Sequence, residues 1–108
     1  MRTQTPSLAP DEQPHDVTVY LVLNDFGELG RAYVETDEAK ADEETVISNI
    51  SSGEYSNPVR VVAFNTVEEW SRDVTEDIAR ALFERVLRYD LSESAKKFVE
   101  RVLDIARL

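Results

Sequence analysis

Two short apolar runs stand out in the pattern of hydrophobic and polar positions. Residues 17–23 read VTVYLVL, and residues 59–64 read VRVVAF. Both runs are rich in β-branched residues and nearly continuous in apolarity, which is typical of strands covered on both faces rather than strands with one face in water. The pattern therefore predicts two inner strands. Arg60 indicates that one end of the second strand reaches solvent or an acidic partner.

A first helix is predicted over residues 43–51. Val46, Ile47 and Ile50 would share its inward side at helical spacing. Gly53 would end it, because glycine readily adopts the left-handed conformation that follows many helices. The acidic run DEAKADEE at residues 37–44 lacks the alternating ligands and central glycine of a calcium loop, so it is interpreted as a solvated surface.

Further helices are predicted after the second strand. Residues 66–69, TVEE, match a capping box in which Thr66 is the cap and Glu69 reaches back to it. Asp73 is a second cap at which this helix can restart. A long apolar stripe follows at Val74, Ile78, Leu82 and Val86, and a last helix, capped by Asp90 or Ser92, carries Ala95, Phe98, Val99, Val102 and Ala106.

Residues 26–37, FGELGRAYVETD, allow two interpretations. As a helix, Phe26, Leu29 and Tyr33 fall on one stripe. As a hairpin, Gly27 to Gly30 forms the turn and RAYVET the returning strand. The β-branched and aromatic residues favour the strand, whereas the stripe favours the helix. We take the helical interpretation.

Together these elements predict a small α/β fold. Its order is β-α-α-β-α-α, with a two-stranded sheet and a C-terminal helical hairpin; the sheet becomes three-stranded if residues 28–36 form a strand. A helical crossover between the two strands makes them parallel. Residues 1–16, which contain Pro6, Pro10 and Pro14, are expected to form a disordered N-terminal arm, and residues 17–108 a single α/β domain.

Composition excludes several classes of function. The chain of 108 residues has a formal net charge of −10 and no cysteine, so disulfides, thiolate metal sites and thiol catalysis are excluded. Through Asp77 it carries 17 acidic and 5 basic residues, which argues against binding to nucleic acid or to an anionic membrane. No apolar run reaches the roughly 20 residues that cross a bilayer, and a cytoplasmic location is the default expectation. The lone histidine, His15, lies in the predicted arm, where nothing orients its ring as a ligand or base.

Two strings of residues carry a family resemblance. YLVLNDFGELGRAYVETD, followed by VISNISSGEYSNPVRVVAFNTVEEWSRDVTEDIA, resembles a family of short uncharacterised proteins found mainly in α-proteobacteria, and the resemblance covers residues 17–79. The family usually carries glycine immediately before the tryptophan, where this chain has Glu69. This departure favours a continuous helix over a sharp turn. The function of the family is unknown, so the resemblance implies no activity, cofactor or catalytic residue.

One polar cluster is a candidate ligand-binding site. Ligands of open parallel sheets bind beyond the carboxyl ends of the strands, which here are Asn24-Asp25 and Asn65-Thr66. Side chains at neighbouring strand ends would converge. The alternative is that asparagine, aspartate and threonine occur at strand ends and helix caps for local hydrogen bonding. The candidate binding residues are Asp25, Asn65, Thr66, Trp70, Arg72 and Asp73; no catalytic residue, metal ligand or cofactor is assigned.

The leading functional hypothesis is a non-enzymatic interaction or regulatory module that acts through protein partners. A small sheet exposes unpaired N–H and C=O groups along its edges, and a second protomer would cover them, so a homodimer is expected. A small-molecule or anion-binding domain that uses Asp25, Asn65 and Thr66 is the alternative. The net charge also allows an acidic, antitoxin-like binder of a basic protein. Neither nucleic acid nor a membrane is an expected partner.

Overall fold

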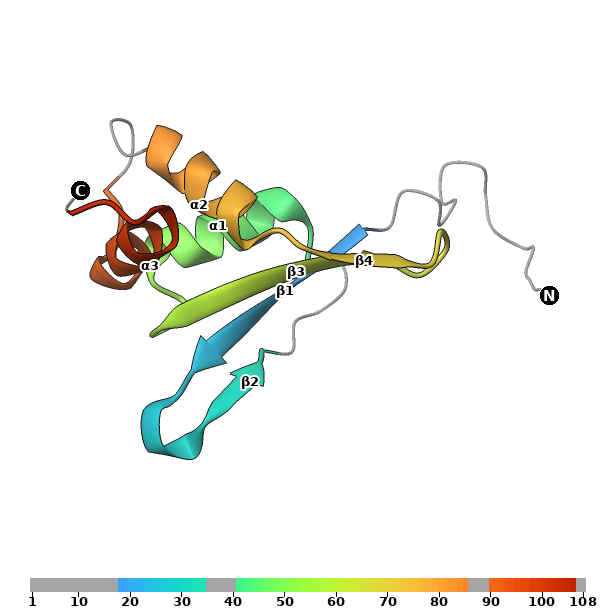
Figure 1. Ribbon diagram of the computed structural model, residues 1–108, viewed down its shortest axis with the longest axis horizontal. Coiled ribbons are helices and arrows are strands. Elements are labelled where there is room, and N and C mark those ends of the chain that lie inside the picture. Colours follow the sequence, from blue (N-terminus) through green and yellow to red (C-terminus); the bar gives the residue numbers. More distant parts are fainter. Residues whose placement is uncertain (1–17, 35–40, 86–89, 107–108) are drawn as a thin grey trace.

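The computed structural model describes residues 18–34, 41–85 and 90–106 of the chain. Within them, an antiparallel sheet of four strands has the order β2-β1-β3-β4. The helices lie on one side of this sheet (Figure 1). The strands are β1 (Thr18–Asp25), β2 (Arg31–Tyr33), β3 (Pro58–Asn65) and β4 (Trp70–Asp73), and the helices are α1 (Glu43–Ser52), α2 (Thr75–Glu84) and α3 (Glu93–Leu103).

Several predicted elements are confirmed. The two apolar runs form β1 and β3, which pair with each other at the centre of the sheet. Helix α1 buries Val46, Ile47 and Ile50, and Gly53 ends it with a left-handed φ of 88°. Ser92 caps α3, because its hydroxyl accepts the N–H of Ala95 at 3.1 Å.

The predicted parallel sheet of β-α-α-β-α-α order is wrong. β1 and β3 are antiparallel, with Thr18 opposite Asn65 and Leu21 opposite Val62, and the order of elements is β-β-α-β-β-α-α. The physical reason is that β2 reverses the chain before α1 begins. β2 and β3 therefore run in the same direction but lie on either side of β1, and every pair of neighbouring strands in the described sheet is antiparallel.

The helical interpretation of residues 26–37 is also wrong where the structure describes them. Gly27–Leu29 is a single 3-10 turn, and β2 returns along β1 with Tyr33 opposite Leu23. Gly30 has a φ of 91°, which side-chain-bearing residues rarely adopt, so the hairpin turn requires glycine there. The hairpin interpretation that the sequence left open is therefore the correct one.

No helix starts at Thr66. Residues 66–69 form a turn between β3 and β4, and the carboxamide oxygen of Asn65, rather than a capping box, accepts the N–H groups of Val67 and Glu68 at 2.9 Å each. Glu69 occupies the left-handed region with a φ of 60°. A sharp turn thus forms with glutamate at this position, and the continuous helix expected from Glu69 is wrong.

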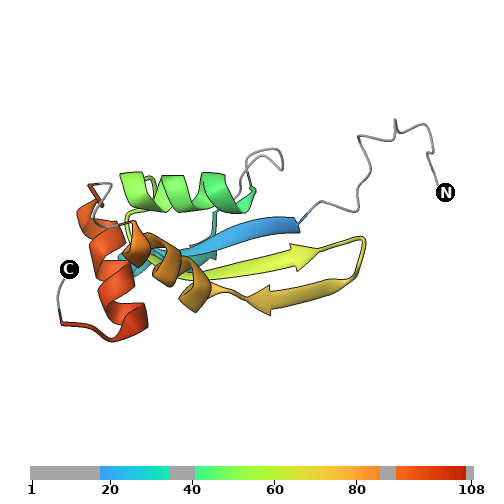
Figure 2. The same cartoon turned by 90° about the horizontal axis from the view of Figure 1, so that it is seen from above.

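The core lies between the helices and one face of the sheet. Alternate residues of the central strands point into it, namely Val22 of β1 and Val61 and Ala63 of β3. Figure 2 looks onto the helix side, where α1 runs along β1 and α3 crosses the end of the sheet at which β3 begins. The helices contribute Val46, Ile47, Ile50, Ile78, Ala79, Leu82, Ala95, Phe98 and Val99.

Some predictions fall outside the described residues. These are the N-terminal arm over residues 1–16 with His15, the acidic residues 37–40, and Val86 of the predicted apolar stripe.

Candidate functional site

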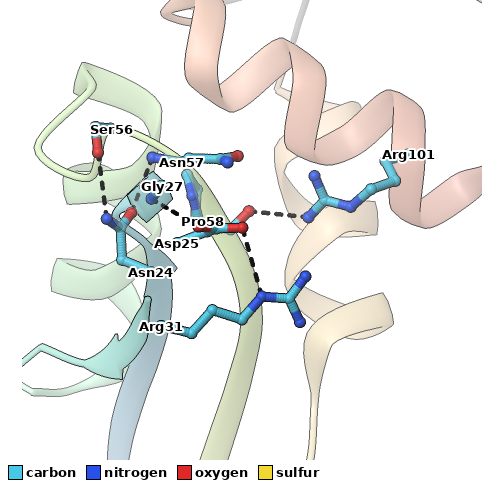
Figure 3. Close-up of polar contacts among 8 residues, drawn as sticks. All are labelled: Asn24, Asp25, Gly27, Arg31, Ser56, Asn57, Pro58 and Arg101. Atoms are coloured by element: carbon cyan, nitrogen blue, oxygen red, sulfur yellow. Dashed lines mark hydrogen bonds and ion pairs between the residues drawn. The ribbon is translucent and has the colours of Figure 1, made fainter. Parts of the chain in front are cut away.

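A buried asparagine organises one end of the sheet (Figure 3). The Asn24 side chain is 1% exposed; its amide nitrogen donates to the Ser56 hydroxyl at 3.2 Å, and its oxygen accepts the N–H of Asn57 at 2.8 Å. Arg101 of α3 donates to the carbonyl of Pro58 at 2.9 Å. These contacts join the end of β1, the loop before β3, the first residue of β3 and the last helix. Both the amide nitrogen and the oxygen of the Asn24 side chain are thus hydrogen-bonded within the protein. This cluster therefore stabilises the fold.

Asp25 belongs to the same end of the sheet. Its carboxylate accepts the N–H of Gly27 at 2.8 Å and lies 3.4 Å from the Arg31 side chain, so it closes the β1–β2 turn. In the antiparallel register Asn24 is opposite Pro58, whereas Asn65 is opposite Thr18. The expected convergence of Asp25 with Asn65 and Thr66 does not occur, because the carboxyl ends of antiparallel strands lie at opposite ends of a sheet.

The other five candidate residues gather at the end of β3 and along β4. Asn65 is 3% exposed, and its amide donates to the Thr18 hydroxyl at 3.2 Å while its oxygen holds the turn. Thr66 is exposed in that turn. Asn65 thus performs a local hydrogen-bonding role, as the alternative interpretation of the cluster required.

Of the six candidate residues, Trp70 and Arg72 border a hollow in the surface. They lie opposite Asn65 and Ala63 in the register, on the helix side of the sheet, and with Ser71 they line a shallow hollow of about 270 Å³. The Trp70 indole N–H donates to Glu68 at 2.8 Å. Within residues 18–34, 41–85 and 90–106, Arg72 forms no ion pair.

Asp73 connects β4 to α2. Its carboxylate accepts the N–H of Thr75 at 2.9 Å and the Thr75 hydroxyl at 2.5 Å, and the Arg60 guanidinium lies 3.6 Å away. Partial burial alone would raise the pKa of the Asp73 carboxyl, but the hydrogen bonds from Thr75 and the charge of Arg60 outweigh it, so the pKa is lowered. The cap predicted at Asp73 is wrong by one residue, because Val74 occupies the N-cap position of α2; Asp73 precedes it and pairs with Arg60 rather than with Arg72.

Arg72, beside the hollow, also acts on the ionisation of Tyr20. Burial and the nearby carboxylates of Glu43 and Asp77 raise the pKa of Tyr20, although Arg72 opposes them. Over the described residues, no group of three or more His, Cys, Asp or Glu side chains is placed to hold a metal ion. None of the helices described is long and apolar enough to cross a membrane.

The most conspicuous surface is one that the candidate residues do not include. The side of the sheet opposite the helices carries six apolar residues at alternate positions of β1, β2 and β3, beside the charged residues Asp25, Arg31, Arg60 and Asp73. All are partly or largely exposed, and Tyr33 of β2 reaches 43%. None belongs to the core or packs against it. We call this surface the open face; it consists of Val19, Leu21, Leu23, Tyr33, Val62 and Phe64.

The open face had a signal in the sequence. The near-continuous apolarity of residues 17–23 and 59–64 indicated strands covered on both sides. In the structure the helices cover Val22 and Val61, but no described element covers Leu21 and Val62, which pair side by side on the other face. The pattern thus indicates a second covering layer that the described part of the chain does not supply.

Comparison of the chain with protein-family models, with curated proteins and with solved structures finds no match.

Proposed function

We propose that this chain is a non-enzymatic interaction module whose open face binds a protein partner. The observation that supports the proposal is the continuous apolar surface on the central strands, on the side of the sheet that no described helix covers. Apolar side chains exposed as a contiguous patch, rather than singly, are typical of protein-binding surfaces.

The contacts of the polar residues at the strand ends support a binding role rather than a catalytic one. Asn24, Asn65 and Asp73 are engaged in joining strands, turns and helices. The described residues that line the hollow beside β4 are Trp70, Ser71 and Arg72, and none of these types commonly serves as a general acid or base at neutral pH. Binding energy from the open face would come from removing its apolar area from water, at about 25 cal/mol per Å².

Site-specific photo-cross-linking tests the proposal. Photoreactive p-benzoylphenylalanine replaces Leu21 or Phe64 on the open face, and as a matched control it replaces Phe83, an aromatic residue of α2 that is 44% exposed on the helix side. After irradiation of cells that express the chain, discrete protein adducts are expected from positions 21 and 64 and not from position 83. Absence of adducts from both open-face positions, or equal adducts from position 83, would contradict the proposal.

Binding of a small anion beside Trp70 is the second candidate function. The observation in its favour is the hollow of about 270 Å³, which is lined by the Trp70 ring and the Arg72 guanidinium. Arg72 forms no ion pair with any described residue. Titration of the tryptophan fluorescence with phosphate and with a set of carboxylic acids tests it, because Trp70 is the chain's only tryptophan. A response that Arg72→Ala abolishes supports this function, and an unchanged emission with every ligand counts against it.

A further inference from the structure

We infer that the partner of the open face is a second copy of this chain, packed sheet against sheet about a two-fold axis. This inference rests on the proposed function and names the occupant of the same surface. It differs from the dimer expected from the sequence, which was attributed to the edges of the sheet rather than to its face.

The charges around the open face favour self-association. Arg60 pairs with Asp73 at 3.6 Å, and Arg31 pairs with Asp25 at 3.4 Å, so the charged residues of this face cancel. The chain as a whole has a formal net charge of −10. A second copy can therefore approach this face without the repulsion that the acidic surfaces elsewhere would impose, and a strongly basic partner finds no excess negative charge on it.

The acidic residues lie on other parts of the surface. The first turn of α1 carries Glu43 and Glu44, and the first turn of α2 carries Glu76 and Asp77. Both helices pack on the opposite side of the sheet (Figure 1). A face-to-face arrangement keeps these carboxylates on the two outer surfaces of the dimer, where water and counter-ions screen them.

The size of the face fits a weak dimer. Strands β1 and β3 have eight residues each, but β2 has three and β4 has four, so at about 3.3 Å along and about 4.8 Å across a strand each protomer offers roughly 360 Å². Two copies together would bury roughly 700 Å², which is typical of a weak or transient interface rather than a permanent one. Most of the face must therefore take part, and this requires a partner of matching shape.

A two-fold axis supplies that match. In such an interface the same side chains meet on both sides, so an apolar centre meets an apolar centre. Sheets that pack face to face lie about 10 Å apart, with the side chains of Leu21, Val62 and Phe64 between them. The rim then holds arginine and aspartate from each protomer, and the axis can bring each arginine beside an aspartate of the other copy.

Measurement of molar mass by sedimentation equilibrium tests the inference with purified chain. The wild type is expected to approach twice the mass of one 12.3 kDa chain as its concentration rises into the high micromolar range. Phe64→Arg and Leu21→Arg are each expected to raise the dimer dissociation constant at least about 100-fold, because the axis places two unpaired charges in the apolar centre. Phe83→Arg, on the helix side, is the matched control and should leave the dimer intact. Circular dichroism establishes that each variant is folded.

A second measurement does not depend on the arginine variants folding. The natural chain has no cysteine. Val62→Cys, treated with a short bismaleimide, should therefore form covalent dimers, whereas Phe83→Cys should not. Cross-linking that is equal at both positions would overturn the face-to-face arrangement.

The outcomes separate the two proposals. A single-chain mass for the wild type overturns the self-association inference, but photo-adducts from positions 21 and 64 in cells would still support the open face as a binding surface for another protein. A dimer that Phe64→Arg and Leu21→Arg both leave intact places the interface elsewhere and also overturns the inference. A single-chain mass together with no photo-adducts contradicts both proposals.

Discussion

The carboxamide oxygen of Asn24 accepts the backbone N–H of Asn57 at 2.8 Å, across 33 positions of the chain. This bond joins the end of β1 to the residue that precedes β3, and the Asn24 side chain is buried where water cannot replace it. Asn24→Ala is expected to lower the free energy of unfolding by about 2 kcal/mol, because it removes both hydrogen bonds of the Asn24 side chain and leaves a gap where that side chain was buried. Urea unfolding measures this, and Ser56→Ala, which removes only the exposed partner, should cost less than about 1 kcal/mol. Equal losses for the two variants would contradict the assigned role of Asn24.

Glu69 stands where the turn between β3 and β4 favours glycine. Its φ of 60° costs a residue with a side chain about 1 kcal/mol or more. Glu69→Gly is therefore expected to raise the free energy of unfolding by roughly 0.5–1 kcal/mol, after allowance for the greater freedom of glycine in the unfolded chain. Thermal and urea unfolding measure the change.

The matched control for the turn is Glu68→Gly. Glu68 has no left-handed φ and accepts the indole N–H of Trp70 at 2.8 Å, so this substitution should lower stability rather than raise it. Stabilisation by both substitutions would show that the conformation of Glu69 is not the cause.

Asp73 makes stability depend on pH in the acid range. Its carboxyl pKa is lowered in the folded chain, so the unfolded chain binds the proton more tightly. The stabilisation is complete above the unfolded pKa of about 4 and is lost as the pH falls through the lower, folded value. Asp73→Asn is expected to cost about 1 kcal/mol or less at pH 7, because the side chain is largely exposed, and to cost progressively less below about pH 4.

Unfolding curves of the wild type and Asp73→Asn at pH 7 and at pH 3 measure that dependence. Glu54→Gln, at an exposed position, serves as the control and should show no such difference between the two pH values. A cost of Asp73→Asn that stays constant with pH would contradict the assignment.

The elements that the sequence predicted correctly are those that bury a clear apolar pattern. Val46, Ile47 and Ile50 identify α1, and the runs around Leu21 and Val62 identify the central strands, because burial requires those positions to be apolar. The short outer strands have no such requirement. Every residue of β2 and β4 is exposed, so neither strand leaves an apolar alternation in the sequence.

The missing strands explain the error in topology and in the candidate site. If β2 is not recognised, only α1 connects β1 to β3, and a single helical connection implies parallel strands. The extra reversal at β2 makes the two strands antiparallel. That error placed Asp25 beside Asn65, although the structure puts them at opposite ends of the sheet. The helix predicted at the TVEE residues 66–69 is wrong for a related reason. The side-chain oxygen of Asn65 accepts two backbone N–H groups of the turn, much as the Thr66 side chain would accept N–H groups at the start of a helix.

The order of pairing in the sheet also has a consequence for folding. The β1–β2 and β3–β4 hairpins connect residues that are close in sequence, but the central pairing brings Asn65 to Thr18 across 47 positions. Local hairpins form within about 10 µs, whereas closing a long loop costs entropy before any contact repays it. We therefore expect the two hairpins to form early and the docking of β1 onto β3 to limit the folding rate. Substitutions such as Asn24→Ala, at the junction of these strands, should then slow folding more than they accelerate unfolding.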